Sequence, residues 1–266
     1  MNKRLMFSAA LVMALLSANA QKRAFTIEDL YRVKGLSSVS LSPDGKTVCY
    51  TASSSDLKSQ KSGSDIYIMN ADGSHAKALT EDGKSSSAVW GKDGKGIFFT
   101  NYEKGTAQIF RMDLTTCETE QVTDYELGIG SPVISPDERY IAFTAEVYPD
   151  LGADAKANKA RMEKKEQGPV QAHIADKLLY RHWTSYNDGR CNHLILFDTQ
   201  TKTYKDLTPG NYSLIFVVGG GITYQFSPDS KEICFVSTHD EHQEASTNAD
   251  PWTGSAKWGE PVCITK

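Results

Sequence analysis

The chain has 266 residues, 39% of them hydrophobic, and a formal net charge of −4. This length is enough for one all-β domain with a sizeable core. The slightly acidic balance, with a pI near 5.9, excludes a strongly basic surface, so we expect no nucleic-acid partner.

The first 20 residues have the pattern of a signal peptide. Lys3 and Arg4 precede an apolar run at 5–16, and Ala18 and Ala20 form a small-x-small cleavage site. The apolar run of about 12 residues is shorter than the roughly 20 that a membrane-spanning helix needs. We therefore expect residues 21–266 to be exported to the periplasm or secreted, with no membrane span.

A short helix is predicted next. Thr26 to Asp29 approximates a capping box, with Thr26 as the N-cap and Asp29 where Glu or Gln is usual. The helix should extend to about Lys34 and pack at the start of the β domain.

A turn built on Asp with Pro or Gly occurs four times, each time before a short β-rich run. The turns begin at Ser42, Gly91, Ser135 and Ser227, and the runs are TVCYTA, GIFFTN, YIAFTA and EICFVS. A repeated unit that cannot bury its own apolar face must stack on its copies. Because each period of about 45 residues holds several short strands, the repeat predicts an all-β partial β-propeller of about four four-stranded blades.

The last two units depart from the regular pattern. The third, with strands at 140–146, 193–198 and 204–208, carries an insertion at about 149–189, whose charged stretch 150–167 we expect to be a solvated helix or loop. In the fourth, 232–237 is a good strand, but Pro251 cannot donate to a central ladder. We therefore expect an interrupted third strand at 248–252 and an incomplete domain.

The cysteines favour packing over disulfide bonds. There are five, an odd number, and their spacing is irregular. Cys49 and Cys234 occupy the same place in two repeat units, where the other units have Phe98 and Ala142. Both are therefore predicted to be buried thiols.

The segment 179–189 is the best candidate for recognition. Its aromatic faces and fixed donors suit contact with a polar substrate or a partner domain, and the candidate residues are Arg181, His182, Trp183, Tyr186 and Asn187. The alternative is an aromatic cluster that ties the insertion to its blade. Farther on, Gly219–Gly221 is expected to form a tight turn.

The residues provide no catalytic centre. Gly-x-Ser-x-Gly, the nucleophile motif of α/β-hydrolases, does not occur, and no Cys/His spacing is typical of a metal site. We therefore predict no catalytic residue, metal or cofactor in this chain.

Several segments, in this order, resemble a known family. They are 25–30 with 41–46, Arg181–Trp183 with 187–189, Gly219–Gly221 before 226–229, and 246–248. Together they are similar to the N-terminal β-propeller of secreted prolyl oligopeptidase family serine peptidases, nearest to the dipeptidyl-peptidase V and acylaminoacyl-peptidase branch.

This resemblance implies a propeller that restricts the access of peptides to a C-terminal α/β-hydrolase domain. The sequence contains no such domain and fewer blades than the family has, so the resemblance implies a truncated or fragmentary product, or a domain that needs the rest from elsewhere. Its expected partner is a peptide substrate or the missing hydrolase domain, and the chain alone is predicted to be inactive.

Two other interpretations remain open. The repeats also fit a periplasmic TolB-like propeller that acts as an interaction scaffold for an envelope protein. Alternatively, an unclosed propeller exposes edge strands and aggregates.

Overall fold

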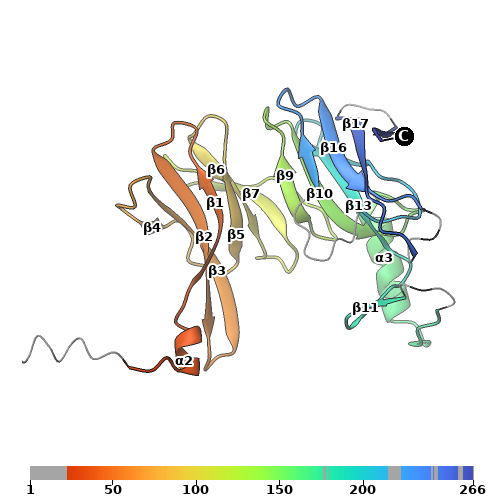
Figure 1. Ribbon diagram of the computed structural model, residues 1–266, viewed down its shortest axis with the longest axis horizontal. Coiled ribbons are helices and arrows are strands. Elements are labelled where there is room, and N and C mark those ends of the chain that lie inside the picture. The colour runs from red at the N-terminus through yellow and green to blue at the C-terminus, as the bar shows by residue number, and fades with distance from the viewer. Residues whose placement is uncertain are drawn as a thin grey trace, which may run out of the picture.

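The computed structural model describes residues 23–175, 178, 180–214, 223–240, 242, 245–256 and 260–265. The predicted signal peptide and Gly219–Gly221 lie outside these residues. Figure 1 shows the described part as a row of β-sheets, with helices α2 (Ile27–Leu30) and α3 (Ala155–Glu166) at their lower ends.

Four antiparallel sheets of four strands each follow one another along the chain, which confirms the predicted partial β-propeller. Each sheet is one blade, and the blades are numbered in chain order. The first blade contains β1 (Gly35–Leu41), β2 (Thr47–Asp56), β3 (Lys61–Asn70) and β4 (Lys77–Ala78). The second contains β5 (Ser85–Trp90), β6 (Gly96–Asn101), β7 (Gln108–Asp113) and β8 (Thr119–Gln121).

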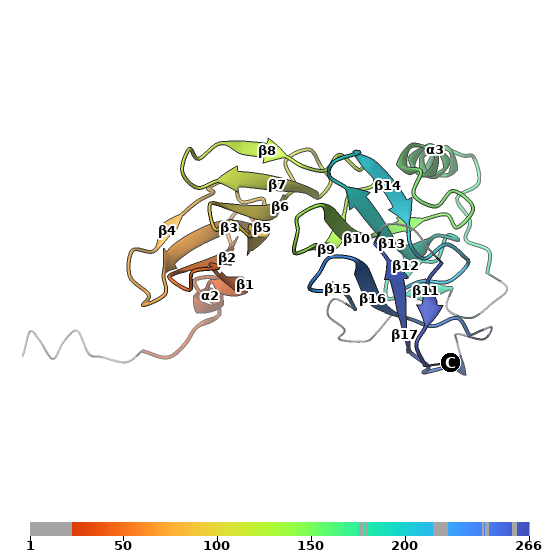
Figure 2. The ribbon, with the colours of Figure 1, turned by 90° about the horizontal axis from the view of Figure 1, so that it is seen from above.

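The third blade contains β9 (Gly130–Ile134), β10 (Tyr140–Val147), β13 (Cys191–Asp198) and β14 (Thr203–Asp206). Between β10 and β13 the chain forms α3 and a small hairpin of β11 (Arg181–His182) and β12 (Ser185–Tyr186). The fourth blade contains β15 (Tyr224–Phe226), β16 (Glu232–Ser237), β17 (Asp250–Ser255) and β18 (Val262–Cys263). Figure 2 shows β1, β5, β9 and β15 innermost, with β4, β8 and β14 at the periphery.

The repeated Ser-Pro-Asp turn joins the first two strands of a blade by the same hydrogen bonds each time. In the first blade the Ser42 hydroxyl donates to Asp44 at 2.7 Å and accepts from the backbone N–H of Thr47 at 2.9 Å. Ser135 and Ser227 make the equivalent bonds in the third and fourth blades. The sequence repeat therefore reflects a repeated turn geometry, because the Ser and Asp side chains stabilise the turn that connects the two strands.

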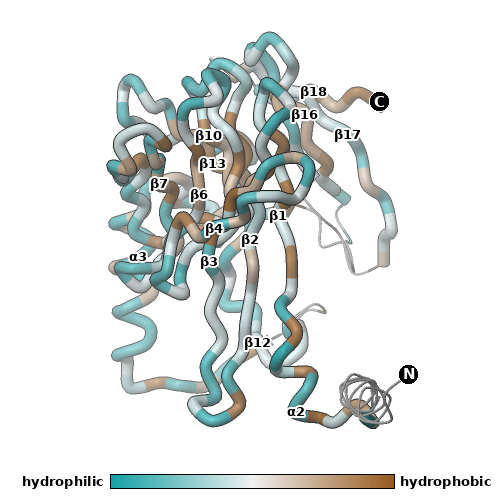
Figure 3. Tube along the Cα trace, turned by 90° about the vertical axis from the view of Figure 1, so that its left-hand side faces the viewer, coloured by the Kyte–Doolittle hydropathy of each residue, from teal (hydrophilic) through white to brown (hydrophobic). Residues whose placement is uncertain are grey.

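Along a central strand, successive side chains point alternately toward the preceding blade and toward the following blade. In β10, Ile141 and Phe143 pack toward the second blade, whereas Tyr140 and Ala142 pack toward the fourth. This is the period of two expected of a strand, with both faces buried. Three hydrophobic cores result, one between each pair of consecutive blades. Figure 3 shows the hydrophobic segments on the strands and hydrophilic residues along α3.

Three expectations about single elements were wrong. Cys49 is buried as predicted, but Cys234 is exposed because no described strand covers its face of the fourth blade. The fourth blade has its third strand, since Pro251 lies in β17 opposite Val236 and accepts a hydrogen bond from Ile264 at 2.9 Å without needing an N–H. Proline is compatible with a position where its nitrogen has no ladder partner.

The third wrong expectation concerns the N-terminal helix. The capping box of Thr26 and Asp29 forms, but α2 ends at Leu30 instead of continuing to about Lys34. Ile27 and Leu30 are 67% and 59% exposed, so the helix does not pack on the β domain. Its interactions are local, including an ion pair between Arg23 and Asp29.

A buried charge pair stabilises the third blade. His193 in β13 is fully buried, with Nδ1 2.7 Å from Asp206 and Nε2 3.0 Å from the carbonyl oxygen of Gly210. Only the doubly protonated ring donates to both acceptors. Burial alone would lower the pKa of the imidazole, but its hydrogen bonds and the charge of Asp206 outweigh that effect and raise the pKa of His193 to about 9.

The raised pKa predicts how stability depends on pH. Because the folded-state pKa lies above the unfolded value, the contribution of His193 is complete below about pH 6.5 and is lost as the pH rises through about 9. The free energy of unfolding, measured by urea denaturation, should fall by on the order of 3 kcal/mol across this window. His193→Gln should flatten the dependence; identical curves for the two proteins would contradict the assignment.

Candidate functional site

A cavity of about 630 Å³ lies between the second and third blades, beside α3. We call it the inter-blade groove. One wall comes from the loop after β6, a second from the loop before β9, and the others from β10, α3 and the residues around the start of β13. This volume is within the range of sites that bind small ligands.

Two loops approach closely at the base of the groove because one residue is a glycine. Gly128 has a φ of +78°, and a Cβ at this position would lie 3.2 Å from the Cβ of Thr106. The next residue, Ile129, donates its N–H to the carbonyl oxygen of Ala107 at 3.1 Å. Glycine therefore allows both the backbone conformation and the contact.

A buried amide fixes the same two segments from below. The side chain of Gln108 donates to the carbonyl oxygen of Tyr125 at 2.7 Å and accepts from the Tyr125 N–H at 3.1 Å and the Thr123 hydroxyl at 2.8 Å. All the atoms of this network are buried, so it resists deformation of the loop.

Helix α3 is attached to the blade by Asn158, which is fully buried. Its side chain accepts from the Tyr148 N–H at 2.6 Å and donates to the carbonyl oxygens of Gly152 and Asp154 at 3.0 and 2.8 Å. The side chain of Asp154 caps the helix by accepting from the Ala157 N–H at 3.0 Å. One face of α3 is thus held against the groove.

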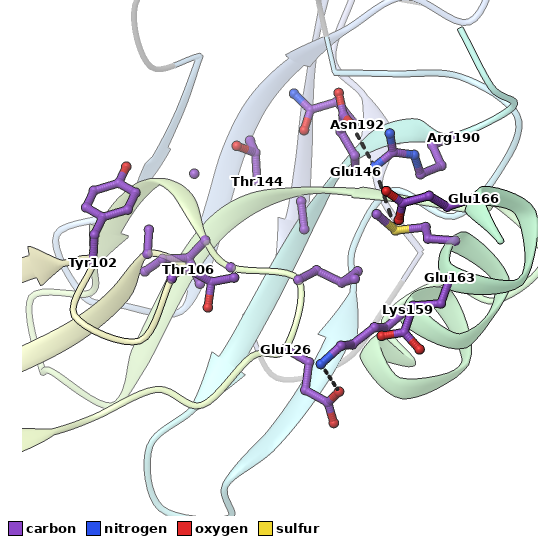
Figure 4. A pocket seen from close by; sticks show the side chains of 18 residues that line it. Tyr102, Thr106, Glu126, Thr144, Glu146, Lys159, Glu163, Glu166, Arg190 and Asn192 are labelled. Carbon is purple, nitrogen blue, oxygen red and sulfur yellow. Dashed lines mark hydrogen bonds and ion pairs between the residues drawn. The ribbon is translucent and has the colours of Figure 1, made fainter.

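Both cations that line the groove are paired within it. The Nζ atom of Lys159 lies 3.4 Å from Glu126, and the guanidinium of Arg190 lies 3.0 Å from Glu146. Figure 4 shows the first pair bridging α3 and the loop that contains Glu126.

Two further carboxylates, Glu163 and Glu166, give the groove an excess of negative charge. They lie in the last turn of α3, and no described residue forms an ion pair with either. Figure 4 shows them on the helix side, facing the side that bears Tyr102 and Thr106. Negative charge at a helix C-terminus is unfavourable for the helix itself. The arrangement suits a cationic group of a ligand.

The rest of the lining is largely apolar. None of the 18 lining side chains is Ser, Cys or His. The apolar residues of the groove are Ala107, Leu127, Ile129, Ala145 and Met162. The groove can therefore bind a ligand that combines a cation with an apolar portion.

The predicted contact residues lie on the hairpin of the insertion and not in the groove. Arg181 and His182 form β11, Tyr186 is in β12, and Trp183 lies at the turn between them and is 83% exposed. The N–H of Asn187 donates to the carbonyl oxygen of Tyr180 at 2.8 Å, which closes the hairpin. The role of these five residues as substrate or domain contacts stays a prediction.

The hairpin is held next to the groove and exposes apolar surface. Lys165 of α3 donates to the carbonyl oxygen of Asp188 at 3.1 Å, and His173 stacks on Tyr186 with ring centroids 4.1 Å apart. The large apolar side chains exposed on the insertion are Val170, Ile174, Leu178, Tyr180, Trp183 and Tyr186. A patch of this kind is typical of an interaction surface.

Sequence reasoning missed Glu163 and Glu166, because it treated 150–167 as a charged, solvated stretch. The available signal was two glutamates three residues apart in the last turn of a helix, where the helix dipole disfavours them. In the described ranges, no group of three or more His, Cys, Asp or Glu side chains could hold a metal ion. The described helices include none that is long and apolar enough to span a bilayer.

Comparison with known families gives a match over more than half of the chain. The model of the TolB β-propeller domain matches residues 20–167. This range covers the first two blades, the start of the third and α3.

Relatives with curated names are peptidases. Dipeptidyl-peptidase 5 of Porphyromonas gingivalis is 29% identical over 81% of this chain and 31% of its own length. The uncharacterized peptidase YuxL of Bacillus subtilis is 24% identical over 86% of this chain and 33% of its own. The chain therefore spans about a third of the length of these relatives.

Solved structures of low sequence identity share the fold. The acylaminoacyl peptidase of Pyrococcus horikoshii aligns with a TM-score of 0.62 and 19% identity over 88% of this chain and 32% of its own. The β-propeller domain of the trilobed protease from Pyrococcus furiosus aligns with a TM-score of 0.52 and 16% identity over 89% of this chain and 58% of its own.

Asn158→Ala should loosen α3, because three buried hydrogen bonds are lost. Limited trypsin digestion should then cleave after Lys159 and Arg161 about tenfold faster, at a cost of roughly 1.4 kcal/mol for local opening. Glu163→Gln, an exposed change on the same helix, is the matched control. Equal cleavage rates in all three proteins would show that Asn158 does not anchor the helix.

Proposed function

Since the chain belongs to the TolB β-propeller family, we propose that it is the non-catalytic propeller part of an exported serine peptidase similar to dipeptidyl-peptidase 5. In this role the inter-blade groove receives the amino-terminal end of a peptide. The observation that carries the proposal is that two carboxylates, Glu163 and Glu166, lie beside an apolar lining and form no ion pair with any described residue.

A peptide amino terminus matches both features of the groove. Its ammonium group is positively charged at neutral pH and donates charge-assisted hydrogen bonds to carboxylates. Its first side chains would cover the apolar lining, and the volume of about 630 Å³ accommodates a few residues. The groove would thereby select peptides with a free amino terminus.

Hydrolysis would be performed by residues outside this sequence. A serine nucleophile with its His and Asp partners would come from an α/β-hydrolase domain, as the missing Gly-x-Ser-x-Gly motif requires. The exposed hairpin residues Trp183 and Tyr186 are suited to contact such a domain, because exposed aromatic side chains are common at the centres of interfaces.

The proposal places the protein in the periplasm or outside the cell, on the pattern of residues 1–20. A second candidate function is a scaffold for an envelope protein, which the exposed apolar surface of the insertion would also suit. This alternative would be favoured if the chain bound no peptide but captured an envelope protein in a way that Trp183→Ala abolished.

Peptide binding tests the role of the groove. We expect a fluorescently labelled tripeptide with a free amino terminus to bind, and its amino-acetylated form to bind at least tenfold more weakly. Glu163→Gln and Glu166→Gln should each weaken binding about tenfold, since a charge-assisted hydrogen bond is worth about 1.5–3 kcal/mol. Glu118→Gln, at an exposed position away from the groove, is the control and should leave the affinity unchanged. Equal binding of the free and acetylated peptides would overturn the proposal.

The purified chain should not cleave a dipeptidyl chromogenic substrate, because it has no serine nucleophile motif. The measurement is release of the chromophore over hours, with a full-length dipeptidyl-peptidase 5 as the positive control. Cleavage that a serine-directed inhibitor abolished would contradict this expectation.

A further inference from the structure

The backbone of Glu146 in β10 is turned toward the inter-blade groove. Glu146 lies opposite Asn192 of β13. Asn192 uses its own backbone on the far side of β13, where its carbonyl oxygen accepts from the Leu214 N–H at 2.8 Å and its N–H donates to the Ser213 hydroxyl at 3.0 Å. In an antiparallel ladder, the two residues of such a pair direct their N–H and C=O groups away from each other. The N–H and C=O of Glu146 therefore point away from β13, to the side on which β9 lies.

Strand β9 does not extend far enough to pair with Glu146. Its ladder with β10 ends where Gly130 lies opposite Thr144. The residue before Gly130, Ile129, donates its N–H to the carbonyl oxygen of Ala107 in the second blade. No described residue of β9 or of the loop before it forms a backbone hydrogen bond with Glu146. Glu146 is exposed and lines the groove, which thus contains one open position of a sheet edge.

The first two blades show what this position of the second strand binds when the first strand is longer. In the repeat, Glu146 corresponds to Ser53 of the first blade and to Tyr102 of the second. Ser53 pairs with Gly35 in β1, and the Tyr102 N–H donates to the carbonyl oxygen of Lys84, directly before β5, at 3.2 Å. The equivalent backbone groups of the third blade are therefore placed to pair with a strand, and the chain itself supplies none there.

We propose that a peptide in the groove pairs with Glu146 as an added strand that continues the line of β9. One residue of the peptide accepts a hydrogen bond from the Glu146 N–H and donates its own N–H to the Glu146 carbonyl oxygen, as in an antiparallel ladder. The inference rests on the proposed function and names the form of the ligand, which is an extended peptide chain with intact backbone N–H groups.

The charges of the groove agree with the antiparallel direction. An antiparallel neighbour of β10 begins near the residues that follow β10 and ends beside the first residue of β9. Strand β10 leads through 148–154 into α3, which contains Glu163 and Glu166. In Figure 4, Glu146 is seen between Thr144 and Glu166. The amino terminus of the added strand thus lies toward α3, where carboxylates can accept hydrogen bonds from its ammonium group.

Strand pairing distinguishes a peptide from a simple amine. An amine with an apolar portion would also satisfy Glu163, Glu166 and the apolar lining, but it would make no bond to the backbone of Glu146. Because the added bonds join backbone to backbone, they contribute affinity for any side chains that fit the groove. The edge position therefore favours peptides over other cationic ligands.

Methylation of the peptide backbone tests the pairing in the unaltered protein. The probe is a fluorescently labelled tripeptide with a free amino terminus, methylated on the backbone nitrogen of either its second or its third residue. Successive residues of a strand direct their N–H groups to opposite sides. Methylation at one of these nitrogens should therefore weaken binding about tenfold, and at the other by less than about twofold. Equal losses at both positions, or none at either, would overturn the proposal.

A proline at Glu146 tests the same bond from the side of the protein. Proline has no N–H and is compatible with a strand edge, and the pairing with β13 takes no bond from this N–H. Glu146→Pro should bind the tripeptide about tenfold more weakly than Glu146→Ala, which loses the same carboxylate but keeps the N–H. Equal affinities of two variants that circular dichroism shows to be folded would contradict the pairing.

These outcomes are separate from the test of the proposed function. Equal binding of the free and acetylated tripeptides rejects the groove as a site for a peptide amino terminus, and with it the added strand. Preference for the free form, without a position-specific effect of methylation, supports that site and rejects only the strand pairing at Glu146.

Discussion

Each blade of this fold is a single β-sheet with apolar side chains on both faces. Both faces must therefore be covered by neighbouring parts of the protein. In β13, Ile195 and Phe197 pack toward the second blade, while Leu194 and Leu196 pack toward the fourth. No blade can bury both faces by itself, so burial comes from stacking the repeats. The positions of the loops, of α3 and of the groove all follow from that stacking.

Local features of the chain were predictable from the sequence, and features that depend on a neighbour were not. The turns at Ser42, Ser135 and Ser227 form as expected, because their hydrogen bonds join residues at most five positions apart. The exposure of Cys234 could not be read from its place in the repeat, since burial at that place depends on whether another blade follows. Pro251 was expected to interrupt its strand, but the carbonyl oxygen of Pro251 accepts a hydrogen bond from the Ile264 N–H, and this bond needs no N–H from proline.

The groove was hidden from sequence analysis for a related reason. Its walls come from segments between Tyr102 and Asn192, and they meet only because the second and third blades stack. The five residues proposed from the sequence instead lie within one short segment, 181–187, where composition alone sets them apart, and this segment forms a surface hairpin. Amino-acid composition identifies residues that cluster along the chain. A site between two repeats can be identified only when the packing of the repeats is known.

The turn contacts between blades link the sequences of neighbouring repeats. The fourth turn residue has a positive φ in every blade, whether it is Gly94 or Glu138. Glu138 accepts a hydrogen bond from the second residue of the preceding turn, Lys92, and a Cβ at Gly94 would lie 3.6 Å from the second residue of the first turn, Pro43. That position therefore satisfies a backbone requirement of its own blade and a contact requirement of another. The repeats cannot diverge independently there: replacement of Lys92 by proline, as in the other three turns, would remove the N–H that Glu138 accepts from, and the two positions should change together as the repeats evolve.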